Sequence, residues 1–348
     1  MTLAANQIID LRSDTVTKPT PEMLKAICNA NIGDDFYGDD PTVKELEELS
    51  AKKLEKEAGL FVTSGTMGNL VSIMSQTHHG ESILLETEAH MFRCESGNIS
   101  AVAGVLPKCI NGKDGFFEIE DVSNNINKDE MLFSKTTLLC IENPHNAAGG
   151  TVLKKELMDK LCKTAHNLGL RVHVDGARIF NAAVCINVEA SDLVKEADTI
   201  TFCLSKDLGC PYGSVVVGDK ETIAKARKMR QILGGGLRQG GIMAAAGVYA
   251  LHNHIARLKE DHENAQFLAN GLLELGFKVN LNNVQTNMVY ADAPLKIGNI
   301  SFCEKLNNRG IIVNIPQKGK KIRFVVHIGI SKKDIKSVIE IIKKIIGE

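Results

Sequence analysis

The sequence has almost no excess charge of either sign, with 41 lysines and arginines against 42 aspartates and glutamates. Without a broad electrostatic field, the chain has no general attraction for nucleic acid or anionic lipid. No apolar run approaches the ~20 residues that span a bilayer, and the N-terminus lacks a basic head followed by an apolar core. We therefore expect no nucleic-acid partner and no membrane partner, but a small-molecule ligand and further copies of the chain.

Cysteine motifs are also missing. The nine cysteines include no C-x-x-C pair and no His-x-x-Cys grouping, and their number is odd. This usage is typical of reduced cysteines and not of a disulfide framework or a zinc site. We expect a cytoplasmic protein without a metal site. No G-x-G-x-x-G motif follows a predicted strand, which argues against a nicotinamide-dependent dehydrogenase.

Strands and helices alternate along the first part of the chain. With 348 residues and 44% apolar content, the chain can bury a large core. A helix is predicted over 41–57, with Asp40 as its N-cap and Pro41 at its first position. The predicted strands are Leu60–Val62, Ile83–Leu85, Leu138–Ile141, Leu170–Val174, Ile200–Leu204 and Ser214–Val217. Because these runs lack polar alternation, they predict an α/β fold whose mostly parallel sheet is covered on both faces and binds ligands beyond the carboxyl ends of its strands.

The C-terminal part has a different order of elements. An alanine-rich helical region is predicted from Ile242 to about Leu275. Beyond it the pattern predicts strands over 278–281, 286–290, 311–315 and 322–327, and helices over 300–309 and 332–346. This order is typical of a small α+β domain. We therefore predict a large domain of residues 1–250, which includes the N-terminal arm, and a C-terminal domain of residues 251–348.

Two reactive residues follow predicted strands. Lys206 lies between the strand that ends at Leu204 and the next buried run. Lysine is rarely buried unless it is paired or neutralised, so this position indicates either an exit to solvent or a chemical role. Asp175, in VHVDGAR, follows another buried run. It can cap the next helix, or it can hold a ring nitrogen in its protonated form.

Two glycine-containing segments can bind a phosphate. Gly65 and Thr66, in TSGTMGN, lie between a strand and a helix, where backbone N–H groups and a hydroxyl can hold an anion. In GGGLRQGG, the glycines permit a tight backbone and Arg238 offers a forked donor. Each segment alone also fits an ordinary turn or surface loop. Together with the aspartate and the lysine, they supply the parts of a pyridoxal 5′-phosphate (PLP) site: an acid for the pyridinium, an amine for the aldehyde and a cradle for the phosphate.

Nine stretches carry a resemblance to a known family: DLRSDTVTKPT, GDDFYGDDPTV, TSGTMGNLV, EAHMFRCESG, ENPHNAAGGTV, HVDGARIFNA, CLSKDLGCPYGSVVVG, LGGGLRQGGIMAAAGVYAL and IRFVVHIGIS. In this order the chain resembles the threonine aldolases, close to the low-specificity L-threonine aldolases, over most of its length. The resemblance implies a fold-type I PLP-dependent enzyme with an aspartate aminotransferase-like large domain and a small α+β C-terminal domain. It also implies aldol cleavage of L-threonine, L-allo-threonine and other β-hydroxy amino acids to glycine and an aldehyde.

The resemblance implies roles for the residues that would bind the cofactor. Lys206 would form a Schiff base with PLP, and Asp175 would hold the pyridinium proton. His90, in EAHMF, would lie flat against the ring within reach of the substrate's β-hydroxyl, where either this histidine or a bound water would be the base. The residues that would bind the phosphate are Gly65, Thr66, Ser205 and Arg238.

The resemblance also implies which residues bind the substrate carboxylate and how the subunits share their active sites. Ser13, Arg178 and Arg323 would fix the substrate carboxylate, the arginines as planar forks. Tyr37, in the acidic loop DDFYGDD, would reach into a neighbouring subunit's active site, which implies a homodimer or homotetramer with shared sites. By composition alone this loop is an acidic turn and a helix cap. Two further candidates, for which a structural role is the alternative, are Glu95 and Asn146.

Several positions depart from the family pattern. Leu132 lies near a position where several relatives carry a histidine that influences discrimination between threonine and its allo epimer. Asp207 replaces a frequent glycine, and its charge either raises the pKa of the Schiff base or faces solvent. Arg93 and Cys94 stand where more apolar residues are common, which changes the pocket beside His90.

Other functions fit parts of the same pattern. Another PLP-dependent lyase, such as a β-eliminating lyase, would share the cofactor chemistry, as would an aldolase for bulkier β-hydroxy amino acids. A non-catalytic binding protein would keep the fold without turnover, although the intact lysine, aspartate and arginines argue against it.

Overall fold

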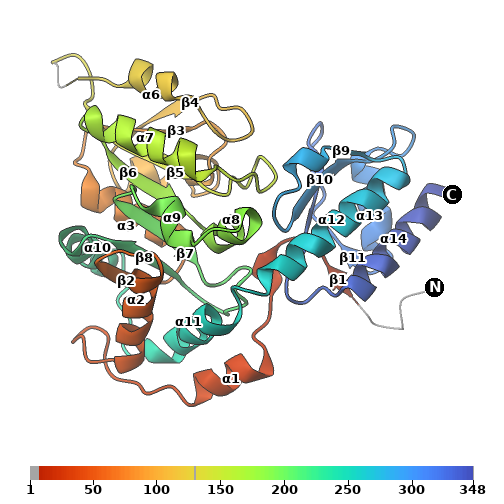
Figure 1. The fold of residues 1–348 in the computed structure, drawn as a ribbon, viewed down its shortest axis with the longest axis horizontal. Coiled ribbons are helices and arrows are strands. Elements are labelled where there is room, and N and C mark those ends of the chain that lie inside the picture. The colour runs from red at the N-terminus through yellow and green to blue at the C-terminus, as the bar shows by residue number, and fades with distance from the viewer. Residues whose placement is uncertain (1–7, 129–130, 348) are drawn as a thin grey trace.

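The computed structural model describes residues 8–128 and 131–347. A large unit and a smaller C-terminal unit lie side by side, joined through α11 (Gly241–Asn253) and α12 (Leu258–Glu274) (Figure 1). The alanine-rich region predicted as continuous from Ile242 to about Leu275 is thus two helices, with a break over 254–257. Within the described residues, no helix combines the length and the apolar character needed to cross a membrane.

A seven-stranded sheet with the order β2-β8-β7-β6-β5-β3-β4 forms the centre of the large unit. Its strands are β2 (Ala58–Val62), β3 (Ser82–Glu86), β4 (Leu106–Ile110), β5 (Thr136–Glu142), β6 (Arg171–Asp175), β7 (Thr199–Cys203) and β8 (Ser214–Gly218). Only β8 runs antiparallel to its neighbours, β2 and β7. The predicted mostly parallel sheet is therefore confirmed, but the edge strand β4 was missed because its half-exposed residues form no apolar run.

Both faces of this sheet are covered, as the continuous apolar strands predict. Successive residues of one strand enter different clusters: Phe61 packs with one cluster, whereas Leu60 and Val62 pack with another. The helices of the large unit are α1 (Pro21–Cys28), α2 (Pro41–Lys53), α3 (Gly65–Gln76), α4 (His90–Arg93), α5 (Asn98–Ala101), α6 (Ile119–Asn125), α7 (Lys155–Asn167), α8 (Ile179–Ile186), α9 (Ala190–Val194) and α10 (Lys220–Ile232). A short 3-10 helix also spans Asp14–Val16.

Helix α2 shows how local chemistry sets the path of the chain. Asp40 caps its start by accepting from the backbone N–H groups of Thr42 and Val43 at 3.1 and 3.0 Å. The helix ends at Lys53 and not at residue 57 as predicted, because Glu55 takes a left-handed conformation with φ 49°. The chain then turns directly into β2.

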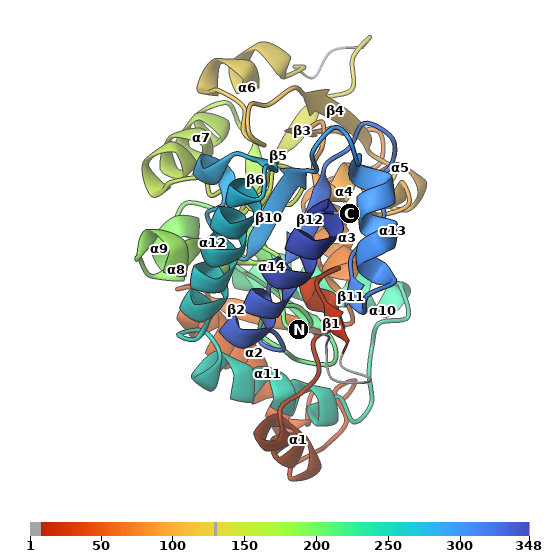
Figure 2. The same ribbon diagram turned by 90° about the vertical axis from the view of Figure 1, so that its right-hand side faces the viewer.

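The C-terminal unit has its own apolar core. A three-stranded antiparallel sheet of β9 (Lys278–Val279), β10 (Met288–Asp292) and β12 (Ile322–Val325) packs with α12, α13 (Asn299–Asn307) and α14 (Lys332–Gly347). The N-terminal arm joins this unit, because β1 (Ile9–Asp10) pairs in parallel with β11 (Ile311–Ile312) (Figure 2). Ile9 and Leu11 are buried in the same core. The domain bounds given from the sequence place this arm in the large domain and stay a prediction.

Candidate active site

Lys206 lies in the turn that links β7 to β8, at the carboxyl end of β7. Its side chain is half-buried, and its carbonyl oxygen accepts from Thr17 Oγ1 at 3.1 Å and from the Gly209 N–H at 2.9 Å. The turn is closed at its base by the Leu204 N–H, which donates to the Gly213 carbonyl at 3.0 Å. The lysine backbone is therefore fixed both by its own turn and by the N-terminal arm.

Asp175 ends the neighbouring strand β6 and is held by two donors. Its Oδ2 accepts from Asn69 Nδ2 at 2.9 Å, and its Oδ1 accepts from the Ala177 N–H at 3.1 Å. Asn69 Nδ2 also donates to Glu95 Oε1 at 2.9 Å, and the same oxygen lies 3.0 Å from His90 Nδ1. Polar atoms of His90, Glu95 and Asp175 thus lie within 4.8 Å of one another.

His90 has a defined orientation at the start of α4. A carboxylate can only accept, so Nδ1 carries the hydrogen directed at Glu95, and Nε2 has no hydrogen-bond partner among the described residues. The hydrogen bond to Glu95 raises the pKa of His90 above its usual range, burial acts against it, and the charge of Asp175 raises it further. The Lys206 charge opposes the shift, which places the lysine within electrostatic range of the ring. The backbone N–H of His90 donates to Glu142 Oε2 at 2.6 Å.

A buried chain of hydrogen bonds extends from Asn69, which contacts Glu95 and Asp175, to His173 and Thr199. Asn69 Oδ1 lies 3.1 Å from His173 Nε2, and His173 Nδ1 lies 2.8 Å from Thr199 Oγ1. Burial lowers the pKa of His173 to about 4, so this imidazole stays neutral and donates through Nε2. Asn69, His173 and Glu142 were not predicted from the sequence. The available signal was their position inside the quoted stretches TSGTMGNLV, HVDGAR and ENPHNAAGGTV.

Both candidate arginines converge on one amide oxygen. Asn146 Oδ1 accepts from Arg323 Nη1 at 3.3 Å and from Arg178 Nη1 at 3.5 Å. Arg178 Nη2 donates to Asp14 Oδ1 at 2.8 Å, and its Nε also donates to this carboxylate. Ser13, next to Asp14, donates to the same carboxylate at 3.3 Å. The fold therefore gathers Ser13, Arg178 and Arg323, together with Asn146, although they come from distant parts of the chain.

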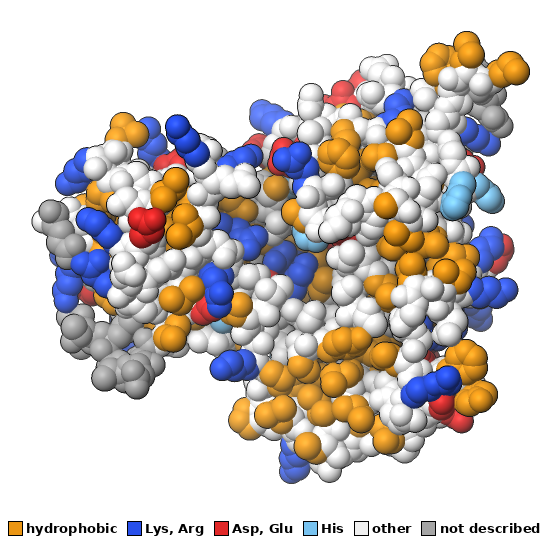
Figure 3. Space-filling view, turned by 180° about the vertical axis from the view of Figure 1, so that it is seen from behind, with side chains coloured by type: hydrophobic (Ala, Val, Ile, Leu, Met, Phe, Trp, Pro, Cys, Tyr) orange, Lys and Arg blue, Asp and Glu red, His pale blue; other side chains and the backbone are white. Residues whose placement is uncertain are grey.

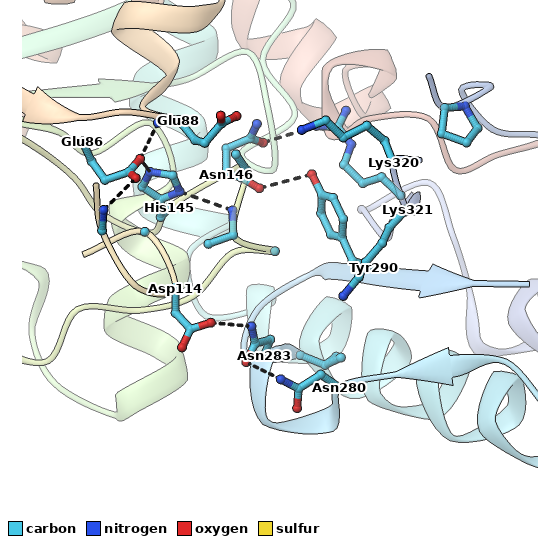
Figure 4. Close-up of a pocket in the computed structure, with 18 of the residues that line it drawn as sticks. Glu86, Glu88, Asp114, His145, Asn146, Asn280, Asn283, Tyr290, Lys320 and Lys321 are labelled. Atoms are coloured by element: carbon cyan, nitrogen blue, oxygen red, sulfur yellow. Dashed lines mark hydrogen bonds and ion pairs between the residues drawn. The ribbon is translucent and has the colours of Figure 1, made fainter. Parts of the chain in front are cut away.

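A cavity of about 950 Å³ adjoins this group, between the large unit and the C-terminal unit. Arg323, Asn146 and Tyr290 are among the residues that line it, and Tyr290 donates to the Asn146 carbonyl at 3.3 Å. Figure 4 shows these two residues facing each other, with Glu86, Glu88 and His145 on the side of the large unit and Lys320 and Lys321 on the opposite side. Of the two arginines, Arg323 thus faces this polar space.

The start of α3 forms a cradle for an anion. The first N–H groups of a helix, here those of Gly65 and Thr66, have no acceptor inside the helix. A Cβ at Gly65 would lie 2.8 Å from Cys203 Sγ and 3.8 Å from Ser214 Oγ. Ser214 Oγ is buried and has no hydrogen-bond partner in the described part of the chain. Free donors beside the end of β7 and the start of β8, near Ser205 and Lys206, fit a phosphate group.

Arg238 and Tyr37 lie elsewhere in the described chain. Arg238 is largely exposed, lies 3.4 Å from Asp34 and stacks 4.7 Å above the ring of Phe36. Tyr37 is 76% exposed. No hydrogen bond or ion pair joins either residue to Gly65, Thr66, Ser205 or Lys206 within residues 8–128 and 131–347.

The residues that depart from the family pattern have different environments. Asp207 is buried, so the alternative that it faces solvent is wrong. Arg93 is exposed and lies 3.8 Å from Glu88, and Cys94 is exposed as well. Leu132 is 86% exposed. Among these, only Asp207 belongs to the buried polar group around Arg178.

The fold and this arrangement define a fold-type I PLP-dependent lyase. A model of the beta-eliminating lyase family matches residues 10–294. The chain is 42% identical over 336 residues to low-specificity L-threonine aldolase 1 of Arabidopsis thaliana, covering 94% of this chain and 93% of that one. It is 39% identical over 335 residues to low specificity L-threonine aldolase of Escherichia coli (strain K12), covering 95% and 97%.

The solved structures agree on the fold. A threonine aldolase of Leishmania major superposes with a TM-score of 0.84 at 18% identity, covering 97% of this chain and 99% of that one. An alanine–glyoxylate aminotransferase of Nostoc sp. superposes with a TM-score of 0.75 at 14% identity, covering 99% and 97%. The predicted fold class is confirmed. The chain belongs to the beta-eliminating lyase family and, within it, to the threonine aldolases.

Proposed function

We propose that the protein is a PLP-dependent aldolase that cleaves L-threonine, L-allo-threonine and other β-hydroxy amino acids to glycine and an aldehyde. The observation that carries the proposal is the meeting of three groups at adjacent strand ends. A half-buried lysine follows β7, a buried aspartate ends β6, and a histidine joined to a carboxylate lies within electrostatic range of both. The names of the full-length relatives support the same activity.

The residues fit PLP at both of its ends. Asp175 would hold the ring nitrogen, His90 would cover the ring face, and Lys206 would bind the aldehyde. Gly65, Thr66 and Ser205 would bind the phosphate, where the unpaired Ser214 hydroxyl adds a further donor. When bound, PLP supplies the electron sink that weakens the bonds at the substrate's Cα.

The other residues orient the substrate and move its proton. Ser13, Arg178 and Arg323 would bind the carboxylate, and two planar guanidinium groups would fix the direction of the Cα–Cβ bond. His90 Nε2, which Glu95 leaves free, would accept the proton of the β-hydroxyl. Because the pKa of His90 is raised, this imidazole becomes an unprotonated base at a higher pH than an ordinary histidine does.

Product analysis tests the activity. Purified protein supplied with PLP and L-threonine is expected to release glycine and acetaldehyde in equal amounts. A 2-oxo acid and ammonia would instead indicate β-elimination, and a bound cofactor without any product would indicate a binding protein. The Lys206→Ala protein under the same conditions controls for cleavage by free PLP.

We also propose that the protein is a homo-oligomer, a dimer or tetramer in the cytoplasm, whose active sites are shared between subunits. Tyr37 and Arg238, for which the resemblance implies roles in the active site, lie exposed beside Phe36, which is 51% exposed. Apolar side chains gather over the lower part of the molecule, where α1 and α11 lie (Figure 3). Leu24 and Ile242 are exposed there. An apolar surface of this kind is typical of a subunit interface, across which Tyr37 and Arg238 would enter the neighbouring site.

Mixing inactive variants tests the sharing of sites. Tyr37→Ala and Lys206→Ala are each expected to be nearly inactive, but hybrids formed by co-expression are expected to regain activity. In a hybrid, one site combines the intact lysine of one subunit with the intact tyrosine of the other. Lys206→Ala mixed with Asp175→Asn is the control, because those two residues would serve the same subunit's site and no hybrid site is intact. No recovery in the first mixture would mean that the sites are not shared through Tyr37.

A further inference from the structure

Asp207 lies directly after the proposed cofactor lysine, and only 2% of its surface is exposed. Its Oδ1 accepts from Asn287 Nδ2 at 2.7 Å, and its Oδ2 accepts from Asn181 Nδ2 at 2.6 Å. Asn181 belongs to α8, whereas Asn287 precedes β10 and also donates to the Val326 carbonyl at 2.9 Å. The Asp207 side chain therefore ties the lysine turn to both units of the molecule.

Two buried carboxyl groups share one guanidinium at this point. Arg178 Nη2 donates to Asp14 Oδ1 at 2.8 Å, and Arg178 Nε lies 3.6 Å from Asp207 Oδ2. Asn287 Nδ2 donates to Asp207 Oδ1 at 2.7 Å and lies 3.4 Å from Asp14 Oδ2, so one amide contacts both carboxyl groups. Two buried carboxylates beside a single guanidinium leave one negative charge uncompensated, whereas a proton on one of them removes it. Arg178 binds Asp14 through two nitrogens, so Asp14 is the carboxyl group that the guanidinium neutralises.

The surrounding charges favour this assignment. Burial raises the pKa of Asp207 well above its usual range, the charge of Asp14 raises it further, and the charge of Arg178 acts against both. Burial alone would also raise the pKa of Asp14, but the charge and hydrogen bonds of Arg178 hold it well below its usual range. The Lys206 charge acts in the same direction on Asp14.

Helix α12, packed on the other side, adds a negative charge at Asp261. Asp261 on α12 repels an ionised Asp207, and Asp261 is itself bonded to Arg257 at 2.7 and 2.8 Å. His262, also on α12, lies 2.7 Å from the Asn181 amide oxygen. Burial lowers the pKa of His262 to about 4, so this imidazole is neutral at neutral pH.

We propose that Asp207 is a positioning residue that stays protonated at neutral pH and so leaves Arg178 its positive charge for the substrate carboxylate. With both carboxyl groups ionised, the group of Asp14, Asp207 and Arg178 would carry a net negative charge and repel a carboxylate. This inference rests on the proposed function in one respect only, the substrate carboxylate that Arg178 would bind. The protonation of Asp207 is a property of the chain without cofactor or substrate.

The first test compares the unfolding of the wild-type and Asp207→Asn apo-proteins over a range of pH. In the unfolded chain, Asp207 ionises near pH ~4. Above that pH the wild type must take up one proton on folding, which the asparagine variant does not need. The wild-type folding equilibrium constant is therefore expected to fall about tenfold per pH unit relative to the variant, between about pH 5 and pH 8. Asp292→Asn, which removes a carboxylate bonded to Asn299 at 2.9 Å, is the matched control.

The second test separates the carboxylate from the amine of the ligand. Glycine and ethanolamine carry similar amines, but only glycine has a carboxylate. Their dissociation constants are measured by absorbance titration of the PLP-loaded protein. Asp207→Asn keeps a neutral donor and is expected to prefer glycine as strongly as the wild type, within about threefold, whereas Asp207→Ala is expected to lose about tenfold or more of this preference.

Parallel pH curves for wild type and Asp207→Asn would overturn the proposal, because Asp207 would then be ionised in the folded protein. A loss of about tenfold or more in glycine preference in the asparagine variant would overturn it as well. If that variant does not fold, carbon-13 spectra of aspartate-labelled wild type decide: one carboxyl carbon must stay at the protonated position at neutral pH. If glycine causes no absorbance change in the wild type, the result counts against the proposed function. The unfolding test still shows whether Asp207 is protonated in the folded protein.

Discussion

Lys206→Ala is expected to lower kcat/KM for threonine cleavage by at least about 10³-fold, the scale on which a covalent catalytic residue is lost. The amine that would bind the cofactor aldehyde is removed, and no other lysine follows β6 or β7 directly in the sequence. The visible absorbance band of the loaded protein is expected to vanish with it. Steady-state rates and absorbance spectra of dialysed protein measure both effects.

Lys56→Ala is the matched control for the loss of a half-buried lysine. Lys56 Nζ donates to the carbonyls of Lys195 and Ala197 at 2.9 and 2.7 Å, so its role in the large unit is structural. Its removal is expected to lower stability while the absorbance band and the activity per loaded protein remain. A Lys206→Ala protein that keeps the band and the rate would contradict the assigned chemistry.

Arg178→Ala is expected to weaken substrate binding. It is also expected to lower the unfolding free energy by about 3–5 kcal/mol, the range for removing one partner of a buried ion pair. Without the guanidinium, the Asp14 carboxylate is left buried and uncompensated. In the wild type the pKa of Asp14 is held low. The contribution of the Asp14–Arg178 pair to the unfolding free energy is therefore complete above about pH 4 and is lost as the pH falls through that lowered pKa. The stability gap between wild type and variant should therefore narrow in acid. Denaturant unfolding at several pH values measures the gap.

Arg171→Ala provides the comparison at the surface. Arg171 Nη2 lies 2.7 Å from Asp219 Oδ2, but its side chain is 36% exposed. An exposed pair of this kind contributes up to about 1 kcal/mol, and its loss is expected to leave KM unchanged. Equal stability losses in the two variants would mean that burial does not set the strength of the Arg178 pair.

The sequence predicted the parts of the site that depend on strand ends. Asp175 and Lys206 each follow a continuous apolar run, and parallel strands end at one edge, so their proximity could be expected before any coordinates. The helix start at Gly65 and Thr66 was visible for the same reason. The resemblance added Ser13, Arg178 and Arg323; without it, Arg323 would be interpreted as a surface residue.

Other contacts could not be predicted because their partners are far apart in sequence. Asn69 bridges Glu95 and Asp175, and no periodicity relates positions separated by 26 and 106 residues. The break between α11 and α12 was missed because both sides keep a helical apolar pattern. Asp207 was recognised as unusual, but its burial depends on Asn181 and Asn287, which the fold brings to it from opposite sides.

The pairing of β1 with β11 has a mechanical consequence. Because β1, the strand that precedes Ser13 and Asp14, pairs with β11, the C-terminal unit anchors these residues on one side, and Arg178 of the large unit binds Asp14 on the other. Arg323, from β12, donates to the Arg12 carbonyl at 3.0 Å. The predicted carboxylate-binding residues therefore come from both units, so the way the two units pack sets the spacing between the two guanidinium groups.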